Sequence, residues 1–173
     1  MNTIIENLLS RRSIRAFKKE DIPMAQLQEI ARAGVYAPSA MNRQTWKFTV
    51  VTRQETISRL AGVIGAQLNR AGYDMYQPAA LIIPSNDRAT VWGREDNACA
   101  LENIFLAAHS LGIGSVWINQ LQGICDEPPV RAVLDEFQLP ANHVVYGIAA
   151  LGYAADGQEN KEVVKTGEIH VIE

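Results

Sequence analysis

The chain has 173 residues and a mass of 19.1 kDa, a size typical of one domain, so we expect residues 1–173 to form a single domain. Hydrophobic residues make up 47% of the sequence and charged residues 20%, proportions that exclude a disordered or fibrous protein. The formal net charge of −3 disfavours a nucleic-acid-binding protein. The two cysteines, Cys99 and Cys125, form no CxxC motif, which argues against a disulfide scaffold and against a zinc site.

One uncharged stretch, residues 103–125, is long enough to span a bilayer. It contains His109, Asn119, Gln120 and three glycines, so it predicts a buried helix followed by a strand instead of a membrane span. Near the N-terminus, Glu6 interrupts the apolar residues and leaves no apolar stretch of signal-peptide length. We therefore expect a cytoplasmic protein that does not associate with a membrane.

Apolar spacing predicts a chain in which helices and strands alternate. Asn2 is the expected N-cap of the first helix, and Pro23 is the expected first residue of the second. The expected helices cover 2–9, 23–34, 55–69, 95–111 and 128–137, and the expected strands cover 46–51, 79–83, 115–118 and 143–151. A loop is expected over 85–94 and a strand-like tail over 169–172. This order predicts an α+β or α/β domain.

The helix expected over 95–111 is apolar on nearly all sides, with a narrow polar stripe that includes Glu102 and His109. A helix of this kind belongs at the centre of a core or at an oligomer interface. We therefore expect this helix to lie at or next to the interface of a homodimer.

Three arginines and a serine gather within five residues, Arg11-Arg12-Ser13-Ile14-Arg15, just after the first expected helix. Guanidinium groups bind phosphate oxygens with two hydrogen bonds at once, and a hydroxyl adds a further donor. This run, called the arginine segment below, predicts an anion site. The alternative is an exposed basic turn, and the segment alone favours neither interpretation.

Small and polar residues gather a second time over 37–46, between the second expected helix and the first expected strand. Small side chains let a planar ligand approach the backbone, and Asn42 and Gln44 offer paired donors and acceptors for the edge of a heterocycle. An ordinary polar loop is the alternative, and the chemistry of this segment by itself favours that alternative.

Gly112 and Gly114 match part of a dinucleotide-binding fingerprint, but Trp117 stands where the third glycine belongs. The segment also leads from a helix into a strand, which is the reverse of the Rossmann order. The three histidines have no metal-ligand spacing, so we expect no metal site.

Taken together and in order, these segments resemble the nitroreductase family of flavoenzymes. The matching residues are the arginine segment, the Pro-Ser-Ala-x-Asn-x-Gln-x-Trp motif at 38–46, the stretch from Asp96 and Asn103 to Gly112-Ile113-Gly114-Ser115-x-Trp117-Ile118, and Leu151-Gly152-Tyr153. The resemblance covers nearly the whole chain, with Thr45 in place of a usual proline and Glu102 in place of a common glutamine. It implies an α+β fold: a three-layer domain whose central, mainly antiparallel sheet is flanked by helices, within an intertwined homodimer.

The resemblance also implies an FMN molecule at the interface of that homodimer. The residues implied to hold its phosphate and pyrimidine edge are Arg11, Arg12, Ser13 and Arg15. The residues implied to come from the partner subunit are Pro38, Ser39, Ala40, Asn42 and Gln44. One face of the ring near N5 is implied to lie along Trp117, Ile118, Asn119 and Gln120. Gln67 or Asn69 would contact the ring edge, and Lys161, or else Lys165, would contact the phosphate.

The implied activity is that of an FMN-dependent oxidoreductase. Reducing equivalents from NADH or NADPH would pass through flavin N5 to a small electron-poor acceptor such as a nitroaromatic or a quinone. Because the flavin itself performs the hydride chemistry, no catalytic side chain is expected. Two alternatives stay open: a reductive dehalogenase of the same family, and a flavin-binding storage or regulatory protein without turnover.

Overall fold

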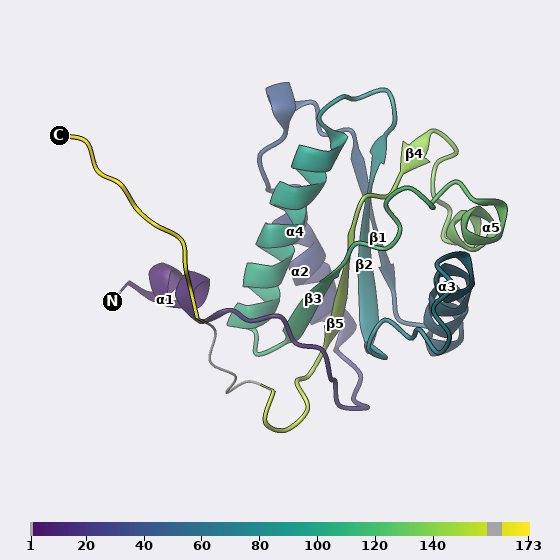
Figure 1. Cartoon of the computed structure of the whole chain (residues 1–173), viewed down its shortest axis with the longest axis horizontal. Helices are drawn as coiled ribbons and strands as arrows, with labels where there is room; N and C mark the ends of the chain where they lie inside the picture. The colour runs from purple at the N-terminus through teal and green to yellow at the C-terminus, as the bar shows by residue number, and fades with distance from the viewer. Residues whose placement is uncertain (1, 159–163) are drawn as a thin grey trace.

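The computed structural model describes residues 2–158 and 164–173 (Figure 1). Its helices are α1 (Thr3–Ser10), α2 (Met24–Val35), α3 (Gln54–Gln67), α4 (Gly93–Ser110) and α5 (Pro128–Glu136), with a 3₁₀ turn, η1, at Ala40–Asn42. Its strands are β1 (Trp46–Val51), β2 (Ala80–Asp87), β3 (Gly114–Ile118), β4 (His143–Val144) and β5 (Ile148–Gly152).

The described strands form one antiparallel sheet between two layers of helices. Its order is β1-β2-β5-β3, with β4 paired to the end of β2. Helices α3 and α5 cover one face, and α2 and α4 cover the other (Figure 1). On the second face α4 buries Leu101, Ile104 and Ala108 against α2 and the sheet. The expectation of a three-layer α+β domain around an antiparallel sheet is therefore confirmed.

The helix boundaries follow local capping chemistry. The side chain of Asn2 accepts a hydrogen bond from the backbone N–H of Ile4 at 2.8 Å, as expected of an N-cap. Pro23 is the N-cap of α2 and not its first residue, because its ψ of 134° is extended. α3 stops at Gln67 instead of 69, since Asn69 adopts a φ of 53°.

The expectation of a single strand over 143–151 is wrong, because these residues form two separate strands, β4 and β5. Pro84 in β2 has no N–H for the ladder, and the register shifts by one residue across it, from Ile82↔Ala149 to Asn86↔Val144. Asn97, fully buried in α4, donates to the carbonyls of Pro84 and Gly147 at 3.4 and 3.3 Å. This amide therefore satisfies two carbonyls where the sheet ladder is interrupted.

The loop expected over 85–94 is shorter in the structure. β2 continues to Asp87, because its last residues pair with both β1 and β4. α4 begins two residues earlier than expected, at Gly93.

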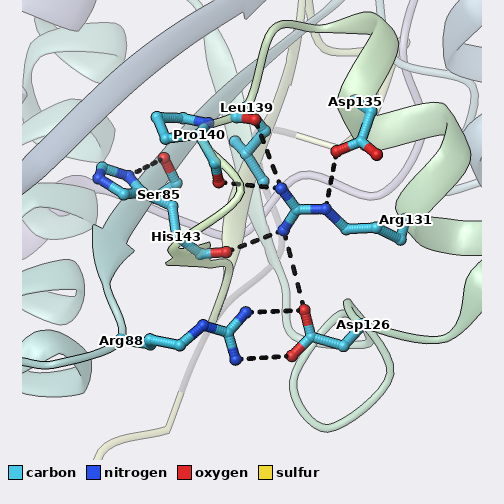
Figure 2. A network of polar contacts seen from close by, with 8 residues as sticks. All are labelled: Ser85, Arg88, Asp126, Arg131, Asp135, Leu139, Pro140 and His143. Carbon is cyan, nitrogen blue, oxygen red and sulfur yellow. Dashed lines mark hydrogen bonds and ion pairs between the residues drawn. The ribbon is translucent and has the colours of Figure 1, made fainter.

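A network of arginines and aspartates fixes the loop that follows β3 (Figure 2). Arg88 holds both carboxylate oxygens of Asp126, at 3.0 and 3.1 Å. Arg131 of α5 lies 3.8 Å from the same carboxylate and donates to Asp135 and to the carbonyl of His143. The loop is thereby tied to α5 and to the β4 region, which restricts the segment just beyond Gln120.

The tail over 164–173 runs away from the sheet (Figure 1). The strand expected over 169–172 is absent from it, because these residues pair with no strand of the described chain. Val164, Ile169 and Ile172 are each at least 80% exposed. Within the described residues, every helix is too short or too polar to cross a membrane.

Candidate functional site

The arginine segment lies along the outer edge of the sheet. Arg11 ends α1 with an extended backbone, and Ser13 then forms a parallel bridge with Ser115 of the edge strand β3. The N–H of Ile14 donates to the carbonyl of Ser115 at 2.9 Å. Two further backbone bonds, Lys18 to Tyr153 and Ala155 to Ala16, pair the following residues, 16–18, antiparallel with the segment after β5. The arginine segment is therefore held beside β3 at Ser13 and Ile14, and the chain beyond it is held beside residues 153–155.

An extended backbone divides the side chains of the arginine segment between two faces. Ile14 is buried, only 5% exposed, whereas Ser13 and Arg15 are exposed. Arg12 shares the face of Ile14, and its Nη1 donates to the carbonyls of Leu9, Ser10 and Arg11 at 2.9, 3.0 and 2.9 Å. Alternation places Arg11, Ser13 and Arg15 together, while Arg12 caps the C-terminus of α1.

Arg11 carries an unused donor. Its Nε is buried and has no hydrogen-bond partner in the described chain. The nearest carboxylate, Glu102 of α4, lies 3.7 Å from this nitrogen and is half exposed. A buried guanidinium N–H without a partner costs free energy, so this atom is suited to a ligand oxygen.

A cavity of about 300 Å³ lies between the C-terminal ends of α1 and α4. Arg12 and Ile14 line it from the arginine segment, and Ser10 and His109 line it from the two helices. The hydroxyl of Ser10 lies 2.8 Å from Nε2 of His109. Burial, and then the charges of Arg11 and Arg12, hold the pKa of His109 below its usual value, so the positive charge here comes from the arginines.

The same edge of the sheet continues, beyond the arginine segment, into residues 117–120: Trp117, Ile118, Asn119 and Gln120. In an antiparallel ladder, backbone groups point alternately to the two neighbours. Because Ser115 faces the arginine segment, the N–H and C=O of Trp117 also face outward, where no other described segment pairs with β3. Beyond the strand, Oε1 of Gln120 is buried and has no partner in the described chain.

The ring of Trp117 packs against the protein on one side and is open to solvent on the other. It is 39% exposed and contacts Phe105 of α4 with ring centroids 6.1 Å apart. Gly147 lies directly beneath it: a Cβ there would overlap Nε1 of Trp117 and lie 2.8 Å from its Cε2. Glycine at 147 therefore leaves the space that the indole ring occupies.

We expect Gly147→Ala to displace Trp117 and to lower the free energy of unfolding by about 1–3 kcal/mol, the usual cost of overpacking. Thermal denaturation and tryptophan fluorescence measure the two effects. Gly62→Ala in α3 is the matched control, because a Cβ at Gly62 meets nothing within 4 Å and alanine favours a helix by about 1 kcal/mol. Equal stability of the two variants would contradict the packing described here.

The loop over 38–44, called the clamp loop below, has a strained backbone. Met41, Asn42 and Gln44 have φ values of 53, 53 and 50°, a region that side chains other than glycine seldom adopt. The N–H of Gln44 donates to Oγ of Ser39 at 3.2 Å, and its Nε2 donates to Oδ1 of Asn42 at 2.9 Å. Pro38, Asn42 and Gln44 are exposed, and Ser39 and Ala40 are half buried.

One chain does not bring the clamp loop and the arginine segment together. The clamp loop leads directly into β1, whereas the arginine segment and residues 117–120 lie along β3 at the opposite edge of the sheet. Three strand spacings separate these edges, about 14 Å. The two sets of residues therefore lie at opposite edges of one chain's sheet, and a second chain would be a way to bring them to the same end of one ligand.

The remaining sequence-derived residues lie apart from both groups. Asn69 is exposed and follows α3 beside Tyr73, whose buried hydroxyl has no partner in the described chain. Burial raises the pKa of Tyr73 to about 12, so the phenol stays neutral. Lys161 lies outside the described residues, and Lys165 is exposed in the tail.

Two contacts near the site involve residues whose roles the sequence did not indicate. Asp96, buried in α4, accepts a hydrogen bond from the N–H of Ala40 in the clamp loop. His109 contacts Ser10 across 99 positions of the sequence. Helical periodicity places both residues on α4 but does not indicate these partners.

The fold and the site define an α+β protein with a basic segment along its edge strand. The model of the nitroreductase family matches residues 8–153. The crystal structure of an FMN-bound nitroreductase from Bacteroides fragilis is 41% identical, with a TM-score of 0.92 and complete coverage of both chains. The NADPH-flavin oxidoreductase of Vibrio harveyi is 32% identical, covering 99% of this chain and 73% of its own. An FMN reductase of Bacillus subtilis is 29% identical, covering 99% of this chain and 76% of its own.

The chain belongs to the nitroreductase family. The match spans all four stretches on which the resemblance rests: the arginine segment, the motif at 38–46, the stretch from Asp96 to Ile118, and Leu151-Gly152-Tyr153. The resemblance is therefore confirmed, and the chain shares its fold with FMN-bound members.

Proposed function

We propose that this protein is an FMN-dependent oxidoreductase that takes reducing equivalents from NADH or NADPH and delivers them to a small electron-poor acceptor, such as a nitroaromatic or a quinone. One observation carries the proposal. Along the outer edge of β3, Nε of Arg11 at one end is a buried donor and Oε1 of Gln120 at the other end is a buried acceptor, and neither atom has a hydrogen-bond partner among the described residues. FMN has a phosphate for the first and a ring N–H for the second.

The residues of this edge have separate binding roles. Arg11 and Ser13 would hold the phosphate, and Arg15, on the same face, would place positive charge near the pyrimidine edge of the ring. The side chain of Arg12 lies on the opposite face of the segment, where it caps the C-terminus of α1. The backbone over 117–120 would line the ring near N5. Asn69 would contact the ring edge, and Lys161 or Lys165 would reach the phosphate from the tail.

FMN, when bound, would supply the hydride chemistry between the nicotinamide and the acceptor, so no side-chain acid or base is required of the protein. What the chain contributes is binding, orientation and an open ring face. Trp117 and the fixed loop beyond it shape one side of the site, and the exposed edge of β3 leaves the other side open to the donor and the acceptor in turn.

The working unit we propose is an intertwined homodimer in which residues 1–173 of each chain fold as one domain. Ile4, Ile5, Leu8 and Leu9 form an apolar stripe on α1 that is at least 44% exposed in the single chain, and the apolar tail is more exposed still. A second copy would cover these surfaces, with α4 next to the interface. It would also bring Pro38, Ser39, Ala40, Asn42 and Gln44 to the flavin. The only partners proposed are this second copy and small molecules in the cytoplasm.

The flavin content of the purified protein tests the binding part of the proposal. Heat denaturation should release about one FMN per chain into the supernatant, since the site holds the flavin without a covalent bond. A steady-state screen with a nitroaromatic, a quinone and a halogenated phenol then separates general reduction from dehalogenation. Colourless protein that cannot be reconstituted with FMN would refute the proposal, and bound FMN without turnover of any acceptor would favour storage.

A further inference from the structure

A buried carboxylate in α4 holds the clamp loop. Asp96 is 4% exposed, and its Oδ1 accepts a hydrogen bond from the N–H of Ala40 at 2.9 Å. It lies in the first turns of α4, where the helix dipole stabilises a negative charge. The bond is charge-assisted and therefore stronger than one between neutral groups.

This bond ties the clamp loop to α4. Ala40 is the first residue of η1, so its N–H has no acceptor within the turn. The other hydrogen bonds of residues 39–44 stay within the loop, such as those from Asn42 to Ser39 and from Arg43 to Ala40. Among the described residues, Asp96 supplies the hydrogen bond that joins 39–44 to another element. A strained, exposed loop with one such attachment moves when the attachment is lost.

We infer that Asp96 is a positioning residue that acts across the dimer: by fixing the clamp loop of its own chain, it orders the flavin site of the partner subunit. The inference rests on the proposed function, which places the clamp loop against the partner's flavin. Asn97, the next residue, instead supports the chain's own site, because it donates to the carbonyl of Gly147 beneath Trp117. Of these two consecutive residues of α4, Asp96 would therefore position the partner's flavin site and Asn97 the site of its own chain.

Single substitutions separate the hydrogen bond from the charge. Asp96→Asn keeps an acceptor oxygen, so it should leave the FMN dissociation constant within about threefold of the native value. Asp96→Ala removes the acceptor and should weaken FMN binding by roughly 10- to 100-fold. Fluorescence titration with FMN measures both, and the visible circular dichroism of the bound flavin reports the order of the site. Equal binding by the alanine and asparagine variants would overturn the inference.

A second variant breaks the same bond without altering the core. Ala40→Pro removes the N–H at the first position of a helical turn, where proline is tolerated. Ser39 already has the extended conformation that precedes proline, with φ −129° and ψ 149°. This variant should weaken FMN binding as Asp96→Ala does, so the inference stays testable even if Asp96→Ala fails to fold. Native FMN affinity in Ala40→Pro would contradict it.

Mixed dimers then decide whether Asp96 acts across the interface. We would co-express one tagged chain carrying Asp96→Ala with a differently tagged chain carrying Arg11→Ala and Arg15→Ala, and purify dimers that hold both tags. If Asp96 serves the partner's site, one of the two sites is fully native, and about half of the native FMN binds with native affinity. If Asp96 serves its own site, both sites are damaged and the mixed dimer binds no better than its parents.

A parallel mixed dimer distinguishes failure of this inference from failure of the proposed function. It combines Asn42→Ala with the same arginine variant, so it tests the clamp loop alone. Recovery in the Asn42 dimer without recovery in the Asp96 dimer would overturn the role of Asp96 and leave the proposed function intact. No recovery in either dimer would refute the shared site, and with it the inference. Native protein that binds no FMN would refute the proposed function itself.

Discussion

Replacing Arg11 and Arg15 together with alanine is expected to weaken FMN binding by a factor of about 10² to 10⁴. Each guanidinium would lose a charge-assisted contact of about 1.5–3 kcal/mol, and both lie on the same face of the arginine segment. The only ion pair lost in the described chain is the half-exposed contact of Arg11 with Glu102, which contributes little to folding. Isothermal titration of the apoprotein with FMN gives the change directly.

Arg53→Ala combined with Arg59→Ala is the matched control for this double variant. Both residues are exposed, Arg53 as the N-cap of α3 and Arg59 within that helix, which lies away from the arginine segment, and Arg59 pairs with Glu136 only at the surface. The control removes the same charge from the protein and should keep native FMN affinity. If the Arg11 and Arg15 variant also keeps full flavin occupancy, the phosphate is held elsewhere.

Asn42→Ala is expected to weaken FMN binding and the homodimer together. The cofactor would bridge two chains, so at a hundredfold excess over its dissociation constant it stabilises the assembly by about 2.7 kcal/mol per site. Loss of the Asn42 amide removes part of that bridge. Fluorescence titration measures the affinity for flavin, and analytical ultracentrifugation across a dilution series measures dimer dissociation with and without FMN.

Backbone strain at this position needs its own control, because the φ of Asn42 is 53° and alanine tolerates that region poorly. Asn42→Gly removes the same amide but adopts a positive φ freely, so a side-chain role predicts weak FMN binding in both variants. Ser58→Ala on the exposed face of α3 should change neither measurement. Loss of flavin with an unchanged dimer would place the whole site within one chain and overturn the interface proposed here.

Most of the fold could be predicted from local patterns, since the helices and the first strands have clear periodicity and capping. The division of β4 from β5 could not, because it arises from Pro84 on a different strand and from the amide of Asn97 on α4. Likewise, the missing strand at 169–172 reflects a segment whose apolar residues are exposed and pair with no strand of the part of the chain that the structure describes. Pairing partners distant in sequence decide such features, and a local pattern does not specify them.

The candidate site was predictable as a set of segments but not as a geometry. The sequence motif treats Arg11, Arg12, Ser13 and Arg15 as equivalent, whereas the bridge to Ser115 makes the segment extended and turns Arg12 toward α1. The clamp loop gives no sign in its own sequence that a carboxylate 56 positions away holds it. Both facts depend on tertiary packing, which sets the direction of each side chain.

Anaerobic mixing of the purified protein with NADH or NADPH tests whether the protein works as a flavin oxidoreductase. The protein should carry a visible flavin band that bleaches with at least one of these donors and returns when a nitroaromatic or a quinone is added without oxygen. That cycle requires bound FMN, access of the donor to the ring and release of the electrons to an acceptor, which together define the proposed oxidoreductase. A flavin band that neither donor bleaches would contradict the proposed oxidoreductase and identify a protein that binds flavin without turnover.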